Sequence, residues 1–203
     1  SKLAKMFFDE AKKEVNFGQY LDIAGDSLAT VDYNWIMQVM RYKTAGYTIE
    51  KPLTIGAALG GASETIISNL SKYGINLGIA FQIQDDILGM FGDEKKVGKP
   101  VDSDLKEGKK TLLVWKTLEN LVHKKRRADL LKFKSILGNP KLTKNDYIWR
   151  QNLMREMEAV EYCENKVKNL TLTAKKSLQK IKIDLTAKRY LFGIADYLID
   201  RNY

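Results

Sequence analysis

The sequence predicts an all-α fold, and three observations support this prediction. Apolar residues recur at helical spacing along most of the chain, and no segment of any length has the period of two that is typical of a strand. Only three prolines occur, so long uninterrupted helices are possible. The length of 203 residues is enough for one domain with a substantial core. We therefore expect a helical bundle.

The first sixty residues predict a long helix, a second helix and a short third one. Apolar residues follow helical spacing over residues 3–30 and again over residues 31–47. Gly46 is a possible break before Pro52, which opens the short helix. The residues of 53–62 are small and mostly apolar, so neighbouring backbones can approach this helix closely.

A long helix over residues 63–92 and a loop over residues 93–108 follow. The loop is too long for a simple turn, and loops of this length are often lids or binding loops. Helical patterns resume after it, at about 109–122, 126–137, 143–178 (with a break) and 184–200.

The end of the long helix carries two adjacent aspartates. Asp85 and Asp86 share one helical face with Gln82 and Gly89, while apolar residues cover the other sides. Two carboxylates on a largely buried helix are costly unless something neutralises them. Because lysines crowd the following loop, the ligand we expect brings both cations and anions, such as a magnesium diphosphate.

Composition excludes several other classes of protein. Cys163 is the only cysteine, so an intrachain disulfide framework is excluded, and we expect this side chain to be inert packing. The net charge is +9, but the one compact basic cluster, residues 123–127, is interpreted as a helix connection rather than a nucleic-acid surface. No signal peptide or transmembrane run is visible, so the expected location is cytoplasmic.

Five blocks of the sequence also carry a resemblance to a known family. They are residues 18–22 (GQYLD), Lys43-Thr44 with Tyr47, residues 81–89 (FQIQDDILG), residues 98–111 (GKPVDSDLKEGKKT) and residues 195–201 (ADYLIDR). In this order they resemble the trans-isoprenyl (polyprenyl) diphosphate synthases, nearest the geranylgeranyl or longer-chain type. The resemblance implies an isoprenoid-synthase-type helical bundle.

One departure from the family pattern concerns the first of its two aspartate-rich motifs. The family carries a DDxxD motif upstream of the GQ block, and this chain has none before residue 18. The resemblance therefore implies that residues 1–203 are the C-terminal portion of a single domain whose N-terminal helices are absent. We expect this portion alone to be inactive, and its sequence leaves the product length open.

The implied reaction belongs to isoprenoid biosynthesis. It condenses isopentenyl diphosphate with an allylic diphosphate of farnesyl or geranylgeranyl type, and Mg²⁺ assists the ionisation. Asp85 is expected to contact the metal, and Asp86 to act through a water or as an orienting neighbour. Departing diphosphate could take the proton that the isopentenyl unit loses.

The resemblance also implies the remaining site residues. Lys43, Thr44 and Gln82 are the expected catalytic residues, the diphosphate is held by these three with Lys99 and Lys109, and Gln19 and Asp22 give support. Tyr47 is expected in the core, and Lys110 as a solvated loop charge.

Two other functions remain open from the sequence, namely a non-catalytic helical subunit of a heteromeric prenyl synthase and a terpene cyclase. Lys43, Thr44, Gln82, Asp85 and Lys99 together favour the synthase. The implied partners are the two diphosphate substrates and a second copy in a homodimer, with no nucleic acid. Incubation with both substrates separates the readings, since elongation indicates a synthase and a cyclised hydrocarbon a cyclase.

Overall fold

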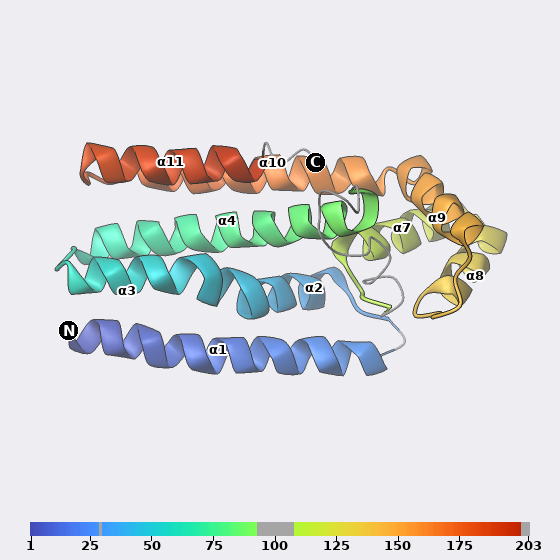
Figure 1. The fold of residues 1–203 in the computed structure, drawn as a ribbon, viewed down its shortest axis with the longest axis horizontal. Coiled ribbons are helices and arrows are strands. Elements are labelled where there is room, and N and C mark those ends of the chain that lie inside the picture. The colour runs from blue at the N-terminus through green and yellow to red at the C-terminus, as the bar shows by residue number, and fades with distance from the viewer. Residues whose placement is uncertain (29, 93–107, 200–203) are drawn as a thin grey trace. The chain divides into compact units, whose positions relative to one another are not determined.

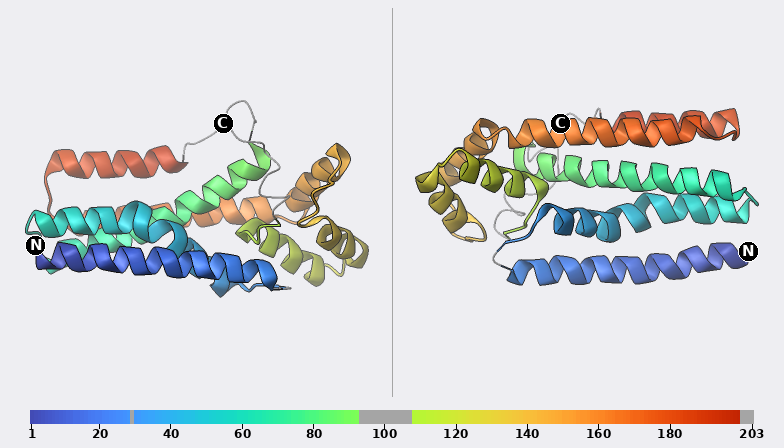
Figure 2. Two further views of the ribbon diagram at one scale, coloured as in Figure 1. Left: turned by 60° about the horizontal axis from the view of Figure 1, so that its bottom comes forward. Right: turned by 180° about the vertical axis from the view of Figure 1, so that it is seen from behind.

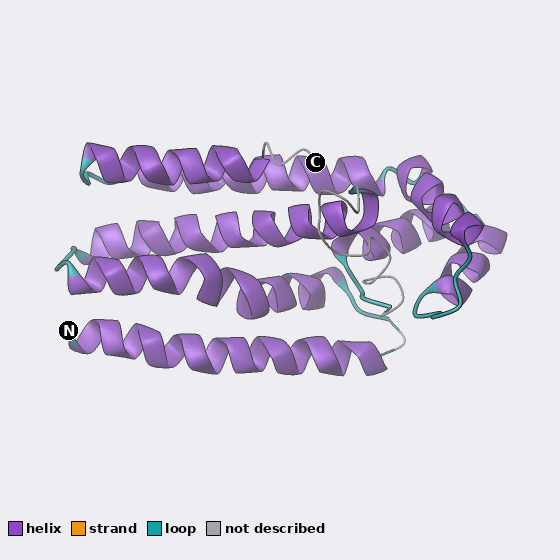
Figure 3. Cartoon of the chain, viewed as in Figure 1, coloured by secondary structure: helices purple, strands orange, loops and turns teal. Residues whose placement is uncertain are grey.

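The computed structural model of the protein describes residues 1–28, 30–92 and 108–199, and Figure 1 shows its fold. No strand occurs in these residues (Figure 3), which confirms the all-α prediction. The helices are α1 (Lys2–Ser27), α2 (Tyr33–Val39), the π-helix η1 (Met40–Glu50), α3 (Lys51–Leu59), α4 (Glu64–Phe91), α7 (Leu112–His123), α8 (Arg127–Ile136), α9 (Lys144–Glu156), α10 (Ala159–Gln179) and α11 (Leu185–Ile199). No helix of these stretches is both long and apolar enough to cross a membrane.

The expected break at Gly46 is wrong. Helical structure runs without interruption from Tyr33 to Leu59, and Gly46 is buried inside it. A Cβ at this position would meet Arg41 Nη1 at 3.0 Å and Glu14 Oε2 at 3.1 Å. The glycine is therefore used for close packing and not to end a helix.

The expected position of Tyr47 is also wrong. Tyr47 is 51% exposed, whereas the sequence predicted that it lies in the core.

The chain forms two compact units, and each is described by itself. The first contains the described residues of 1–24, 37–82 and 166–199, and the second contains residues 25–36 and 83–165. In the first unit α1 runs alongside η1 and α3 (Figures 1 and 2). Its main core joins α4, α10 and α11 through buried residues that include Leu70, Tyr73, Leu77, Ala174, Leu178 and Ala195.

Tyr73 fastens α11 to α4 in this core. Its side chain is 1% exposed, and its hydroxyl donates a hydrogen bond of 2.7 Å to the Leu191 carbonyl. Burial raises the pKa of Tyr73 above its usual value of 10.0, so the folded state keeps the neutral phenol. The two helices are therefore joined by one directional bond in addition to apolar contacts.

Replacing this tyrosine gives a prediction with a defined pH dependence. Tyr73→Phe removes the bond and should lower the free energy of unfolding by about 1 kcal/mol at pH 7. Above pH ~10 the phenol of Tyr73 ionises in the unfolded state but not in the folded state. This difference lowers the free energy of unfolding of the native protein, and Tyr73→Phe lacks it. The difference between the two proteins should therefore shrink as the pH rises past 10. Urea denaturation at pH 7 and 10.5 measures it, and a constant difference would contradict the assignment.

The second unit is built by the end of α4 with α7, α8, α9 and the start of α10. Thr143 starts α9 with a capping box, in which its side chain accepts from the Asp146 N–H and the Asp146 carboxylate accepts from the Thr143 N–H. The Met90 carbonyl, in the last turn of α4, accepts hydrogen bonds from Tyr147 Oη (2.7 Å) and Gln151 Nε2 (2.6 Å). These two bonds satisfy a carbonyl that a helix end leaves without an intrahelical donor.

Arg150 lies on α9, as Tyr147 and Gln151 do, and is 1% exposed. Its Nη2 contacts Met90 Sδ at 2.8 Å. Burial lowers the pKa of Arg150 to about 9, so the side chain stays charged at neutral pH. A cation near the C-terminal end of α4 is stabilised by the carbonyl dipoles of that end.

Candidate active site

The helix η1 carries Lys43 and Thr44, and it is a π-helix of 11 residues. The N–H of Lys51, which follows it, bonds to the Gly46 carbonyl five residues earlier. Such i to i−5 helices are rare, usually last a single turn and are frequent at functional sites. A π-helix of this length is costly on its own, so its neighbours must stabilise it.

One neighbour is α1, which presents a ridge of residues four apart: Glu10, Glu14, Gly18 and Asp22. A Cβ on Gly18 would lie 2.3 Å from the Lys43 backbone nitrogen, so only glycine permits this approach of α1 to η1. One turn further along α1, the Asp22 carboxylate accepts a hydrogen bond from the Lys43 ammonium. Both side chains are about one third exposed, at 32% and 33%.

The other neighbour is α4, whose ridge of Gly74, Gly78 and Gln82 has the same spacing. A Cβ on Gly78 would lie 2.5 Å from Ala45 Cα. One turn later, Thr44 Oγ1 donates a hydrogen bond of 2.8 Å to Gln82 Oε1. The structure therefore pairs Thr44 with Gln82 and Lys43 with Asp22, while Gln19 is exposed on α1 and joins neither pair.

The two aspartates differ in exposure although they are adjacent on α4. Asp85 is exposed, and Asp86 is 9% exposed. Burial, and after it the charge of Asp86, raises the pKa of the fully buried Cys163, which confirms that this cysteine is inert packing. An exposed carboxylate can reach a ligand, whereas a buried one is better suited to orienting its neighbour.

These two carboxylates fit a magnesium ion that also binds substrate oxygens. The described stretches contain no group of three or more His, Cys, Asp or Glu residues that could hold a metal ion. Mg²⁺ does not require such a group, because it often binds one or two carboxylates and completes its shell with water and phosphate oxygens. The exposed carboxylate of Asp85, with the buried Asp86 as its neighbour, therefore fits Mg²⁺ in the presence of a diphosphate.

The predicted lysines after α4 have separate outcomes. Lys99 lies outside the described residues, and Lys109 is partly buried just before α7. Lys110 was expected as a solvated loop charge, and this is wrong. Its ammonium donates to the carbonyls of Gly25, Asp26 and Leu28 at the end of α1. It therefore satisfies carbonyls that the helix end leaves open.

A charge cluster around η1 was not predicted from the sequence. Glu50 and Lys51 are 4% and 5% exposed and sit at the junction of η1 and α3. Burial lowers the pKa of Lys51, but its hydrogen bond to Glu10 and the nearby charges of Glu50, Glu14 and Glu10 raise it overall, so it stays protonated. The signal that could have revealed these contacts is the four-residue spacing E-x-x-x-E-x-x-x-G-x-x-x-D in α1 and G-x-x-x-G-x-x-x-Q in α4.

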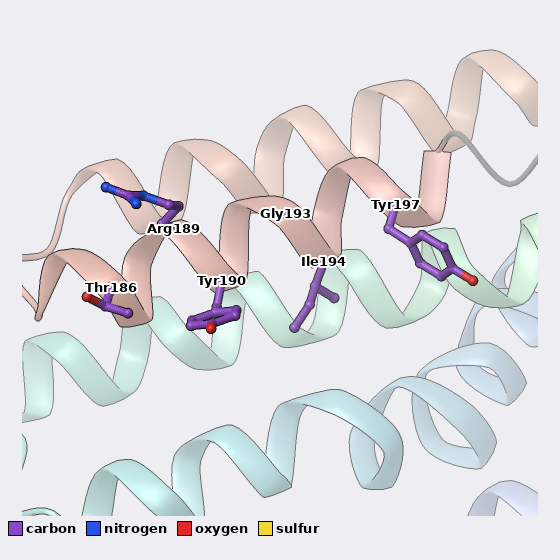
Figure 4. A pocket seen from close by; sticks show the side chains of 6 residues that line it. All are labelled: Thr186, Arg189, Tyr190, Gly193, Ile194 and Tyr197. Atoms are coloured by element: carbon purple, nitrogen blue, oxygen red, sulfur yellow. The ribbon is translucent and has the colours of Figure 1, made fainter.

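A shallow hollow on α11 is a separate feature. It is lined by residues of this helix alone: Thr186, Arg189, Tyr190, Gly193, Ile194 and Tyr197 (Figure 4). Thr186, Tyr190 and Ile194 project from the same side of the helix. Because the lining is mostly apolar and includes no carboxylate, it does not suit a magnesium diphosphate.

Comparison with known proteins decides the family. Residues 2–147, well over half of the chain, match the family model described as polyprenyl synthetase. The chain belongs to the polyprenyl synthetase family. The resemblance seen in the sequence blocks is thereby confirmed.

Relatives of this polyprenyl synthetase chain include two archaeal enzymes and a solved bacterial structure. It is 34% identical to the geranylgeranyl diphosphate synthase of Saccharolobus solfataricus over 92% of the chain and 55% of the relative. It is 33% identical to the geranylfarnesyl diphosphate synthase of Aeropyrum pernix over 95% of the chain and 58% of the relative. The geranylgeranyl pyrophosphate synthase of Corynebacterium glutamicum, complexed with isoprenyl diphosphate and magnesium, aligns with a TM-score of 0.91 and 32% identity over 100% of the chain and 57% of that structure. The chain thus spans about half the length of the curated relatives it matches.

Proposed function

We propose that this polyprenyl synthetase chain serves an enzyme that condenses isopentenyl diphosphate with an allylic diphosphate. The observation that carries the proposal is the bond between Thr44 and Gln82, with Lys43 beside it on a π-helix braced by α1 and α4. The relatives named geranylgeranyl and geranylfarnesyl diphosphate synthase support the same reaction class.

Lys43 would hold the diphosphate of the allylic substrate as a compact point charge. Asp22 would keep the ammonium in place, which lowers the entropy lost when the ligand binds. Thr44 and Gln82 would orient the substrate through their hydroxyl and amide groups. Lys99 and Lys109 are proposed as further diphosphate ligands on the resemblance alone.

Asp85 would contact Mg²⁺ directly and Asp86 would orient it, as the difference in their exposure supports. When bound, the metal supplies positive charge that offsets the charge developing on the leaving diphosphate. The chain's own groups then have to bind and orient the two substrates and keep water out. No protein nucleophile is required, and the departing diphosphate accepts the proton lost from the isopentenyl unit.

The remaining parts of the proposal concern the context of the chain. We propose that residues 1–203 are the C-terminal portion of one domain, because the sequence blocks resemble those that follow the first aspartate-rich motif of the family; all of the chain aligns with 57% of the Corynebacterium synthase. A homodimer is also proposed, and exposed apolar side chains of α1, namely Phe8, Phe17, Tyr20 and Ile23, support a contact surface there. A cytoplasmic location stays a prediction.

The test measures binding and turnover separately. Calorimetry with farnesyl diphosphate should detect Mg²⁺-dependent binding to the 203-residue chain, and Lys43→Met should weaken it about tenfold, because one charge-assisted contact is lost. Lys72→Met, which removes an exposed lysine of α4, is the matched control and should bind like the native chain.

Turnover is then assayed with labelled isopentenyl diphosphate. We expect the chain alone to bind without elongating, and the protein that also carries a first aspartate-rich motif to yield a longer prenyl diphosphate. A cyclised hydrocarbon would favour a terpene cyclase instead. Equal binding by Lys43→Met and Lys72→Met would remove Lys43 from the site.

A further inference from the structure

Five charged residues surround the two ends of η1 within the first unit. Arg41 lies near its start, and Glu50 and Lys51 lie at its end. Arg41 Nη2 is 2.7 Å from Glu50 Oε2, and Arg41 Nη1 is 3.5 Å from Glu14 Oε2. Lys51 Nζ is 2.9 Å from Glu10 Oε2 and 3.4 Å from Glu14 Oε1. Glu14 therefore touches the cation at each end of the π-helix.

The pair of Arg41 and Glu50 depends on the kind of helix that separates them. In an α-helix, residues nine apart are two and a half turns and about 13.5 Å apart along the axis, so they lie on opposite faces. In a π-helix, where each hydrogen bond spans five residues, a turn takes roughly four and a half residues. The same two residues are then about two turns apart and lie on one face. The 2.7 Å contact is thus compatible with the π register and incompatible with the α register.

This pair is shielded from water more than a surface ion pair. The Arg41 side chain is 21% exposed and the Glu50 side chain 6%. Glu50 Oε1 also accepts a 2.7 Å hydrogen bond from Ser71 Oγ on α4, while its Oε2 meets Arg41 as an ion pair without hydrogen-bond geometry. Shielding strengthens the attraction between the two charges, so the loss of one partner destabilises the protein more than the loss of a partner in a surface ion pair.

We propose that the Arg41–Glu50 ion pair, tied to α1 through Glu14 and Lys51, locks η1 in the π register and thereby positions Lys43 and Thr44. This inference rests on the proposed function, because it gives the lock a role in diphosphate binding. If η1 shifted to the α register, the side chains of Lys43 and Thr44 would rotate relative to Lys51. Lys43 would then leave Asp22, or Thr44 would leave Gln82. Arg41 and Glu50 are positioning residues, since neither needs to touch the substrate.

The test reads the register directly. In the uniformly labelled chain, a through-hydrogen-bond NMR coupling should join the Lys51 amide nitrogen to the Gly46 carbonyl carbon, the bond that the structure contains. Glu50→Gln keeps an acceptor for Ser71 but removes the charge. In this variant the coupling should be lost and replaced by one to Tyr47, four residues before Lys51. Arg41→Lys keeps the charge and should retain the native coupling.

Two further variants separate the lock from general destabilisation. Arg41→Met combined with Glu50→Gln removes both charges and leaves neither unpaired. The register can therefore be measured in this double variant if Glu50→Gln alone fails to fold. Asp9→Asn is the matched control, because it breaks the exposed α1 pairs with Lys5 (2.7 Å) and Lys12 (2.8 Å) and touches nothing on η1. It should leave the coupling unchanged.

Binding of inorganic diphosphate with Mg²⁺, measured by calorimetry, separates this inference from the proposed function. We expect about tenfold weaker binding in the variants whose register shifts and no change in Asp9→Asn. A native Lys51–Gly46 coupling in both Glu50→Gln and the double variant would overturn the lock, whatever happens to binding. A shifted register with unchanged affinity would support the lock and instead overturn the assignment of Lys43 and Thr44 as diphosphate ligands.

Discussion

Asp85→Asn is expected to weaken Mg²⁺-dependent binding of inorganic diphosphate by about a hundredfold or more, since the loss even of outer-shell partners costs 10- to 100-fold in metal affinity. The amide has the same shape as the carboxylate but brings no negative charge to the cation. Asp85 is exposed on α4, so this substitution should leave the fold intact. Calorimetry with and without Mg²⁺ measures the loss.

Two companion variants sharpen this result. Asp86→Asn should cost less affinity, about tenfold, because the buried Asp86 is expected to orient the site and not to contact the metal. Glu161→Gln removes an exposed carboxylate at the start of α10 and should have no effect. The assignment fails if Asp85→Asn binds like Glu161→Gln, and the roles of the two aspartates are reversed if Asp86→Asn has the larger effect.

Gly78→Ala is expected to destabilise the chain by about 1–3 kcal/mol, the usual cost of overpacking a close contact. The new Cβ would lie 2.5 Å from Ala45 Cα and 2.6 Å from Ala45 Cβ, so α4 and η1 must move apart. Gln82 is one turn further along α4, and the same movement should break its 2.8 Å bond from Thr44. Diphosphate affinity should therefore fall together with stability.

The control for this steric effect is another helical glycine. Gly56 lies in the middle of α3, and a Cβ there would meet nothing within 4 Å. Gly56→Ala should stabilise the chain by about 0.5–1 kcal/mol, because alanine loses less conformational entropy in a helix. Urea denaturation of both variants measures the change in the free energy of unfolding, which should fall in Gly78→Ala and rise in Gly56→Ala. Stabilisation by Gly78→Ala would show that the contact between α4 and η1 is looser than described.

Much of the fold follows from local pattern. Helical spacing predicted a helix over residues 63–92, close to the observed Glu64–Phe91, and predicted a break that occurs between Glu156 and Ala159. That Asp85 and Asp86 lie on one regular helix was also predictable, but their difference in exposure was not, since the sequence had placed both on one face. Where a helix follows its own periodicity, the sequence is sufficient to locate a side chain on it.

The π-helix was not predictable in this way. Its register depends on contacts distant in sequence, such as Arg41 with Glu14 and Gly78 with Ala45, whereas local propensity would favour an ordinary α-helix. The prediction for Gly46 was wrong for the same reason, since the sequence alone does not distinguish a glycine buried between helices from a glycine that ends a helix. Lys110 was misread because its acceptors, the carbonyls at the end of α1, are more than eighty residues away.

Cys163 is a natural probe of local opening in the second unit. It is the only cysteine of the sequence, it is fully buried, and burial raises the pKa of its thiol. A thiol reagent can react with it only during the moments when the second unit opens locally around α10. The rate of labelling therefore counts those openings next to Asp86, in the native chain and without any added fluorophore or engineered residue.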